Sequence, residues 1–167
     1  MAATGAQEKT RDTDTHFLEA DTREQKRRPT LNIVVDSSVL VAALIDTGPN
    51  GVWAEDVLAG GSLHAPELVC AEATNILRRL ERAKLITTPE ANAAQDDLMQ
   101  LNIEMLSFAP FADRIWELRN NVTSYDAWYV AAAEALKLPL ATLDEPLCRS
   151  NGVKCRFLTP DSGQPPR

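Results

Sequence analysis

Three aspartates occupy positions at which a carboxylate could do chemistry. Asp36 and Asp144 each follow a short apolar run that is typical of a buried strand, and Asp126 lies in the first turn of a predicted helix. The carboxyl ends of parallel strands share one edge of a sheet, so we expect these side chains to face a common crevice. Each also has a purely structural explanation. Asp36 and Asp144 can be helix N-caps, and Asp126 can close a capping box with Thr123.

A fourth acid, Glu72, lies within the longest helical pattern, residues 67–85. It is about 60° around the helix from Val69, at the margin of the apolar stripe. A carboxylate at that position is costly unless it is paired, hydrogen-bonded or bound to a metal. An ion pair with Arg78 or Arg79 is the structural alternative.

Carboxylates that gather without neighbouring histidines favour a hard cation, Mg²⁺ or Mn²⁺. The two histidines, His16 and His64, are too few and too far apart for a histidine-based metal site. A divalent ion held by carboxylates can orient a water, lower its pKa and stabilise charge on a phosphoryl oxygen. The pattern therefore favours metal-assisted phosphodiester hydrolysis. The hydroxyl of Ser38 could orient a ligand or water, or could cap the helix.

Strand and helix patterns alternate along the chain, which predicts an α/β fold. The strand at 31–35 is apolar at nearly every position, so helices should cover both faces of a mostly parallel sheet. We expect a three-layer α/β/α sandwich. Further strands are predicted at 62–66, 103–108, 139–144 and 153–158, and helices at 37–44, 52–59, 67–85, 89–101 with Thr88 as its cap, 111–119, 124–138 and 145–150.

The 167 residues suffice for one domain. Residues 1–29 are polar and aperiodic and are predicted to be a disordered arm, residues 30–160 the domain, and residues 161–167 a disordered tail. The chain shows no secretory signal and no apolar run of membrane-spanning length. Its three cysteines lack metal-ligand spacing, which favours a reduced, cytoplasmic protein.

The net charge of −7 falls on the predicted domain, because residues 1–28 carry six acidic and six basic residues. An acidic domain is a poor general binder of nucleic acid. Its densest basic group is Arg78, Arg79, Arg82 and Lys84. This group is either a solvated face that complements the helix dipole or a surface for an RNA backbone.

The large aromatic residues are predicted to be core or dimer contacts rather than platforms for bases: Trp53, Trp116, Trp128 and Tyr129.

Four segments, in order, resemble a PIN domain of the VapC toxin type: VVDSSVL at 34–40, PELVCAEATNIL at 66–77, SYDAWYVAAAE at 124–134 and LATLD at 140–144. The resemblance covers residues 31–160. It implies a Mg²⁺- or Mn²⁺-dependent endoribonuclease that cuts single-stranded or structured RNA, whether tRNA, rRNA or mRNA. It also implies a homodimer that a co-encoded VapB-like antitoxin neutralises. The long N-terminal arm departs from the family pattern.

In such families, the acids that match Asp36, Glu72, Asp126 and Asp144 line the metal site. The resemblance implies that Asp36 and Asp126 are direct ligands and that Glu72 acts directly or through water. Asp144 would complete the cluster or hold a second ion.

Other classes fit less well. A haloacid-dehalogenase-type phosphatase needs an acid where Ser38 stands, and the phosphate-binding G-x-x-x-x-G-K-[ST] motif is missing from the sequence. A response-regulator-like switch would need a suitable lysine after the last strands. The remaining alternative is a non-catalytic PIN-like binding or scaffold domain, which would be expected to lack the acids that this chain keeps.

Overall fold

The computed structural model describes residues 31–162, so the predicted N-terminal arm lies outside the described residues. All strands pair in parallel in one sheet, in the order β3-β2-β1-β4-β5. The strands are β1 (Ile33–Val35), β2 (Leu63–Pro66), β3 (Ile103–Leu106), β4 (Leu140–Ala141) and β5 (Phe157–Leu158).

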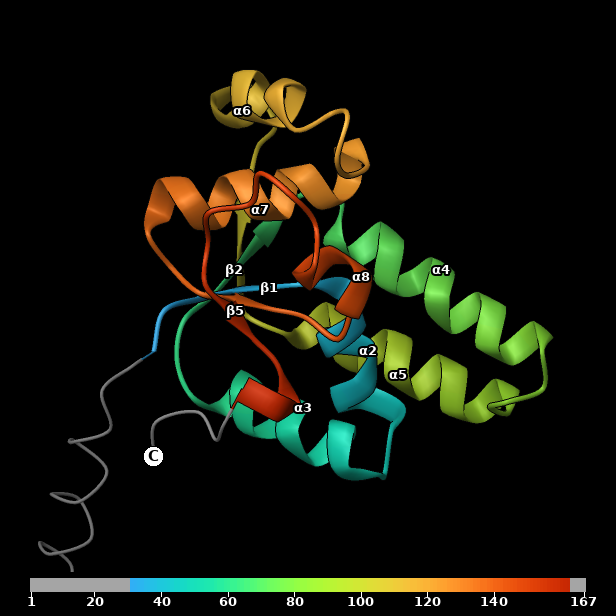
Figure 1. Cartoon of the computed structure of the whole chain (residues 1–167). Coiled ribbons are helices and arrows are strands. Elements are labelled where there is room, and N and C mark those ends of the chain that lie inside the picture. Colours follow the sequence, from blue (N-terminus) through green and yellow to red (C-terminus); the bar gives the residue numbers. More distant parts are fainter. Residues whose placement is uncertain (1–30, 163–167) are drawn as a thin grey trace, which may run out of the picture.

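Helices cover both faces of the sheet, so the predicted three-layer α/β/α architecture is confirmed. Figure 1 shows α6 and α7 on one side of the strands and α2, α3 and α5 on the other. The helices are α2 (Ser37–Ile45), α3 (Pro49–Ala59), α4 (Val69–Arg82), α5 (Thr88–Gln100), α6 (Ala112–Glu117), α7 (Ser124–Leu136) and α8 (Glu145–Cys148), with 3₁₀ turns η2 (Ala109–Phe111) and η3 (Pro160–Ser162).

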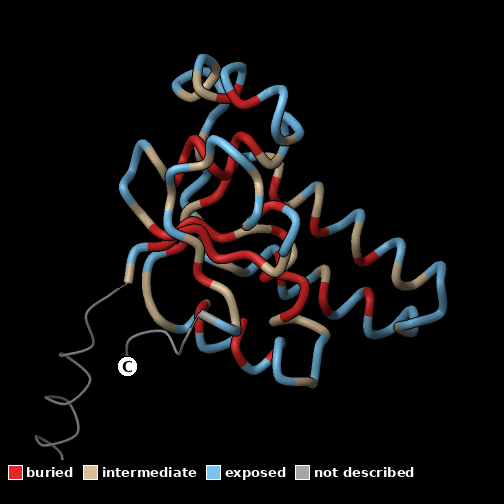
Figure 2. Tube along the Cα trace, in the orientation of Figure 1, coloured by how far each residue is buried: buried red, intermediate tan, exposed pale blue. Residues whose placement is uncertain are grey.

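The core lies where the sheet meets the helices (Figure 2). All of β1 is fully buried, as expected for a central strand covered on both faces. In α7 the run 127–133 is buried throughout, and four of its seven residues are alanine, which lets the helix pack closely. On α4 only Val69, Ala73 and Leu77 are buried, the narrow stripe of a surface helix.

All five strands are shorter than predicted, and β4 and β5 differ most because side chains take up backbone groups next to them. After β4, Leu143 N–H donates to Ser38 Oγ and Asp144 N–H donates to Thr142 Oγ1, so the strand ends at Ala141. Before β5, Lys154 N–H donates to a carboxylate oxygen of Glu134 instead of a strand partner. Both corrections arise from side-chain contacts that a hydropathy pattern does not show.

Several helix boundaries also differ from the predictions. The N-cap of α5 is Thr87, one residue before the predicted cap, and it forms a complete capping box with Glu90. The α4 helix ends at Arg82 because Lys84 adopts a left-handed conformation with φ of 58°. The predicted helix 111–119 is a 3₁₀ turn followed by the shorter α6.

The last described element, η3, includes the first two residues of the predicted tail, and residues 163–167 lie outside the described part of the chain. Within residues 31–162, no helix is long and apolar enough to cross a membrane.

Candidate active site

The strand order reverses beside β1, since β2 and β3 extend the sheet on one side and β4 and β5 on the other. In open α/β sheets, ligands bind at the carboxyl ends of the strands at such a reversal. A cleft of about 590 Å³ lies there, and it is lined by Asp36, Ser37, Ser38, Glu72, Ile76, Asp126, Leu143, Asp144, Glu145 and Pro146. The structure thus brings the four predicted acids, and Ser38, to one cleft.

Asp36 stands at the N-cap position of α2, but its carboxylate makes no capping hydrogen bond. Hydroxyl groups bind it instead. Ser38 Oγ and Thr142 Oγ1 donate to Oδ2 at 2.6 and 2.7 Å, and Ser37 Oγ donates to Oδ1 at 3.2 Å. Side-chain capping therefore does not explain this aspartate. Its carboxylate is held in place at the carboxyl ends of two neighbouring strands.

Ser38 and Thr142 also join the two strand ends. Ser38 Oγ accepts a hydrogen bond from Leu143 N at 3.1 Å, and Thr142 Oγ1 accepts one from Asp144 N at 3.0 Å. Thr142 is fully buried. Thr142 is not among the site residues predicted from the sequence. The one signal that could have identified it is a hydroxyl residue at the end of an apolar strand.

Glu72 is half-buried and accepts a hydrogen bond of 2.6 Å from the hydroxyl of Tyr129. No ion pair with Arg78 or Arg79 is found among the described residues, so the predicted alternative for this acid is wrong. Burial raises the pKa of Glu72, and the negative charges of Asp36 and Asp126 raise it further, although the Tyr129 hydrogen bond opposes the shift.

Tyr129 is 1% exposed, so the prediction that it is a core residue is confirmed, and it also orients an acid of the cleft. This second role was not predicted from the sequence. Burial and the bond to Glu72 raise the pKa of the tyrosine, so its hydroxyl stays a donor.

Asp126 pairs with the hydroxyl of the residue that caps its helix, and its carboxylate accepts from that hydroxyl and not from the Thr123 backbone N–H, so the predicted capping box is only half formed. Thr123 Oγ1 donates to Asp126 Oδ2 at 2.7 Å and accepts from Asp126 N at 3.2 Å. Burial raises the pKa of Asp126, and the charges of Asp144 and Asp36 add to the effect. The carboxylate therefore both stabilises the start of α7 and lines the cleft.

Asp144 likewise has two roles, because its Oδ1 accepts from Leu147 N at 2.9 Å as the cap of α8. The next residue, Glu145, is a further acid of the cleft that was not predicted from the sequence. Its carboxylate pairs with Arg149 at 2.8 Å. Among residues 31–162, no basic side chain lines the cleft.

The donor set of the cleft is entirely oxygen, which suits Mg²⁺ or Mn²⁺. In the described part of the chain, however, no three His, Cys, Asp or Glu side chains form a ready ligand group. Mg²⁺ usually keeps several waters and takes only one or two carboxylates directly. The arrangement therefore fits an ion bound largely through water, and it does not form a closed ligand cage.

The four predicted RNA-contacting residues all lie outside the cleft lining: Arg78, Arg79, Arg82 and Lys84. All are exposed, at or just beyond the C-terminal half of α4. Arg78 donates two hydrogen bonds to Asn75 on its own helix. Arg79 is within about 20° of Glu72 around the helix, so the two residues share a face.

The remaining aromatic residues divide into two groups. Trp53 and Trp128 are core residues, as predicted. Trp116 is 68% exposed on α6, and the Arg119 guanidinium lies over its ring at 4.7 Å. Trp116 is therefore not a core residue.

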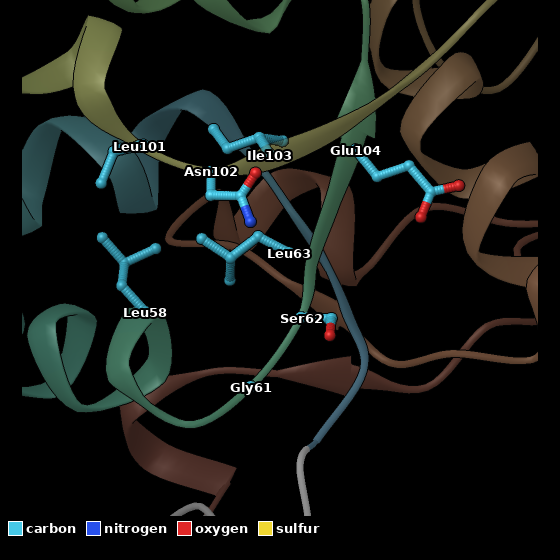
Figure 3. Close-up of a pocket in the computed structure, with 8 residues that line it drawn as sticks. All are labelled: Leu58, Gly61, Ser62, Leu63, Leu101, Asn102, Ile103 and Glu104. Atoms are coloured by element: carbon cyan, nitrogen blue, oxygen red, sulfur yellow. The ribbon is translucent and has the colours of Figure 1, made fainter.

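A second hollow of similar size, about 570 Å³, lies at the opposite end of the strands, where β2 and β3 begin. Of the described residues that line it, only Glu104 is charged, and its carboxylate points away from Leu58 and Leu63 (Figure 3). Because charged groups do not converge there, the cleft at the carboxyl edge is the candidate active site.

A family model described as PIN domain matches residues 33–152, and the chain belongs to that family. Two relatives carry the names of ribonucleases. The chain is 36% identical over 123 residues to VapC ribonuclease Mb0985 of Mycobacterium bovis, and 37% identical over 125 residues to Ribonuclease VapC1 of Mycobacterium tuberculosis. Each alignment covers 74% of this chain and 94% of the relative.

Solved structures share the fold. PAE2754 from Pyrobaculum aerophilum superposes with a TM-score of 0.58 at 22% identity, covering 81% of this chain and 93% of that one. VapBC2 from Rickettsia felis, solved with a DNA fragment from its promoter, gives 0.55 at 14% identity, with coverages of 77% and 98%. The predicted PIN-like fold and the resemblance to VapC proteins are confirmed.

Proposed function

We propose that this protein is a Mg²⁺- or Mn²⁺-dependent endoribonuclease whose active site is the acidic cleft. The supporting observation is that carboxylates from four separate parts of the chain line one cleft at the reversal of strand order, in a member of the PIN domain family. Two relatives named as VapC ribonucleases support RNA as the substrate.

Within this proposal, Asp36 and Asp126 would bind the ion directly and Glu72 would act directly or through water. Asp144 would complete the cluster or hold a second ion. When bound, the ion polarises a phosphoryl oxygen and lowers the pKa of an attacking water. The hydroxyls of Ser38 and Thr142 fix the Asp36 carboxylate before substrate arrives. Burial and neighbouring charge raise the pKa of Glu72, so Glu72 can accept a proton from water at its carboxylate.

Cleavage of RNA by variants of the cleft acids tests this proposal. We expect Asp36→Asn and Asp126→Asn to lose at least about a hundredfold in rate while keeping the native fold. Asp113→Asn is the matched control, because Asp113 is an exposed acid of α6 outside the cleft lining. Chelation of divalent ions should abolish cleavage by the native protein. Equal rates for all variants would contradict the assignment, and RNA binding without any cleavage would support a scaffold domain.

We further propose that the protein is a cytoplasmic toxin, that it forms a homodimer, and that a VapB-like antitoxin inhibits it. The structural neighbours include VapBC2 from Rickettsia felis and FitAB bound to a DNA fragment, whose names support such a partner. A guanidinium pairs well with clustered carboxylates, so an arginine of the partner that enters the cleft would block it. Inhibition that persists after the partner's arginines are replaced would contradict this mode, and light scattering of the purified protein tests the dimer.

A further inference from the structure

One aromatic ring stands exposed beside the cleft. Tyr125 is 63% exposed, although the seven residues 127–133 of the same helix are buried. It directly precedes Asp126, whose side chain lines the cleft. Within residues 31–162, the Tyr125 side chain takes part in no hydrogen bond, ion pair or ring contact. The fold therefore gives this ring no structural task.

Two further aromatic side chains, Trp128 and Phe108, pack together near the start of α7. Trp128 is a core residue and only 9% exposed, so of these two only Phe108 offers much surface to solvent. Trp128 lies one helical turn further along α7 than Tyr125, and the ring of Phe108 packs edge-on against it with 5.1 Å between centroids. Phe108 follows the carboxyl end of β3 and is 44% exposed. The rings thus belong to the same edge of the sheet as the acids.

The charge of the cleft shows why a neutral contact is needed there. In the described part of the chain, acidic residues line the cleft and no basic side chain does, so apart from the proposed metal ion the cleft offers the phosphates of RNA no attraction. The basic residues of α4 lie outside the cleft lining. Stacking of a base on an aromatic ring does not depend on phosphate neutralisation, and it supplies affinity for unpaired nucleotides of any sequence.

We propose that Tyr125 is a substrate-positioning residue whose ring stacks on an unpaired base of the RNA and so holds the adjacent phosphate at the cleft. This inference rests on the proposed ribonuclease function and deepens it. Stacking needs an unpaired base, so this contact suits the single-stranded RNA that the family resemblance implies, or a loop whose base is free to leave its neighbours. Trp116 is also exposed, but its helix contributes no residue to the cleft.

A cleavage assay with single bases removed from the substrate tests this contact. The probes are one single-stranded oligoribonucleotide that the native protein cuts and a series with one abasic position each. We expect one abasic position next to the cut bond to lower kcat/KM about 5- to 100-fold. On the intact oligonucleotide, Tyr125→Ala should lower kcat/KM by the same factor, mainly through a higher KM. Removing the base at the sensitive position should then cause no further loss in this variant. A change that only disturbed the fold would lower kcat/KM on every probe alike.

Two variants serve as controls. Tyr125→Phe keeps the ring and should keep the native kcat/KM, and Trp116→Ala removes a similarly exposed ring and should behave as native. A 2-aminopurine at the sensitive position should lose fluorescence on binding the native protein but not the Tyr125→Ala variant. The inference would be overturned if Tyr125→Ala kept the native kcat/KM. It would also be overturned if the effect of the variant added to the effect of the missing base at every position. Either result would leave the nuclease proposal intact. A native protein that cuts no RNA would instead overturn the proposed function.

Discussion

At the scale of single residues, the cleft combines a tightly held acid with two acids that are costly to ionise. Asp36 accepts hydrogen bonds from three hydroxyls, which fix the position of its carboxylate. Glu72 and Asp126 are half-buried near other carboxylates, and this environment raises the pKa of each. Acids with a raised pKa in a cleft are typical of functional sites.

Thr142→Val tests whether the buried hydroxyl positions Asp36. The change keeps the side chain's shape but removes a donor to Asp36 Oδ2 and the acceptor of Asp144 N–H. We expect a loss of about 1 to 3 kcal/mol in the free energy of unfolding, because a buried N–H is left unpaired. Cleavage should fall about 10- to 100-fold, as is usual when a partner of a metal ligand is removed. Thr142→Ser, which retains the hydroxyl, should keep most of the activity; chemical denaturation and cleavage rates measure both effects.

The raised pKa values of Glu72 and Asp126 predict how the stability of the metal-free protein depends on pH. The folded state holds these protons more firmly than the unfolded state, whose pKa values are about 4.5 and 3.8. This contribution to stability is fully present below the unfolded pKa values and is lost as pH rises through the folded ones. Glu72→Gln and Asp126→Asn stay neutral, so at pH 7 their Tm should exceed the native Tm by a few degrees.

Thermal unfolding in the presence of a chelator, from pH 4 to pH 8, measures this effect. The gain in Tm should shrink as the pH falls toward 4. Asp113→Asn, which replaces an exposed acid outside the cleft lining, is the matched control. A gain of constant size across the whole range would show that the substitutions act through packing and not through protonation.

Sequence patterns identified the acids but missed the residues that hold them. Asp36 and Asp144 are recognisable because a strand end and a helix start are local features. Thr142 and Tyr129 bond to acids 106 and 57 positions away in the sequence, which no local pattern reveals. The capping alternatives were correct only in part. Asp126 and Asp144 take part in hydrogen bonds at the starts of their helices, whereas the Asp36 side chain makes no capping hydrogen bond.

At the scale of elements, α4 carries two chemically different regions on one helix. Its first turn holds Glu72 in the cleft, and its last turn holds Arg79 and Arg82 in solvent. The apolar period of the helix was readable from the sequence. Its ends were not, because a backbone bond from Glu67 N to Leu106 O and the left-handed Lys84 set them.

The double variant Arg79→Ala/Arg82→Ala tests whether this face of α4 contacts the RNA backbone. For single-stranded RNA, removing one arginine–phosphate pair should lower the slope of log K against log salt by about 0.7. RNA binding should therefore weaken most at low salt. Titrations over a range of salt concentrations measure the slope. The control is Lys137→Asn, at the end of α7 remote from Asp126, where asparagine tolerates the left-handed backbone. Equal slopes for the two variants would show that this face of α4 does not contact the RNA backbone and is only a solvated surface.

At the scale of the whole molecule, the candidate active site depends on the strand order β3-β2-β1-β4-β5. Alternation of strands and helices predicted a parallel sheet, and a parallel sheet places the carboxyl ends of its strands at one edge. The strand order could not be predicted, because hydropathy does not show on which side of β1 the fourth strand pairs. That pairing joins Val35 to Ala141 and brings Asp36 next to Thr142, two residues before Asp144.

Because the four acids come together only in the folded chain, binding of a divalent ion should stabilise the whole molecule. Asp36 follows β1, Glu72 and Asp126 lie on separate helices, and Asp144 follows β4. The unfolded chain offers no such site, so an ion at a hundred times its Kd adds about 2.7 kcal/mol to the free energy of unfolding. In a domain of this size that corresponds to a rise in Tm of about 5 to 10 °C.

Thermal unfolding with increasing Mn²⁺ at pH 7.5 measures this rise. Asp36→Asn should lose most of it, whereas Asp113→Asn should keep it. The rise should also diminish at lower pH, because carboxylates must lose their protons to bind a metal and the pKa values of Glu72 and Asp126 are raised. An unchanged Tm for the native protein, or an equal rise for Asp36→Asn, would mean that the cleft does not bind the ion, and the carboxylates would then need a different explanation from metal-assisted cleavage.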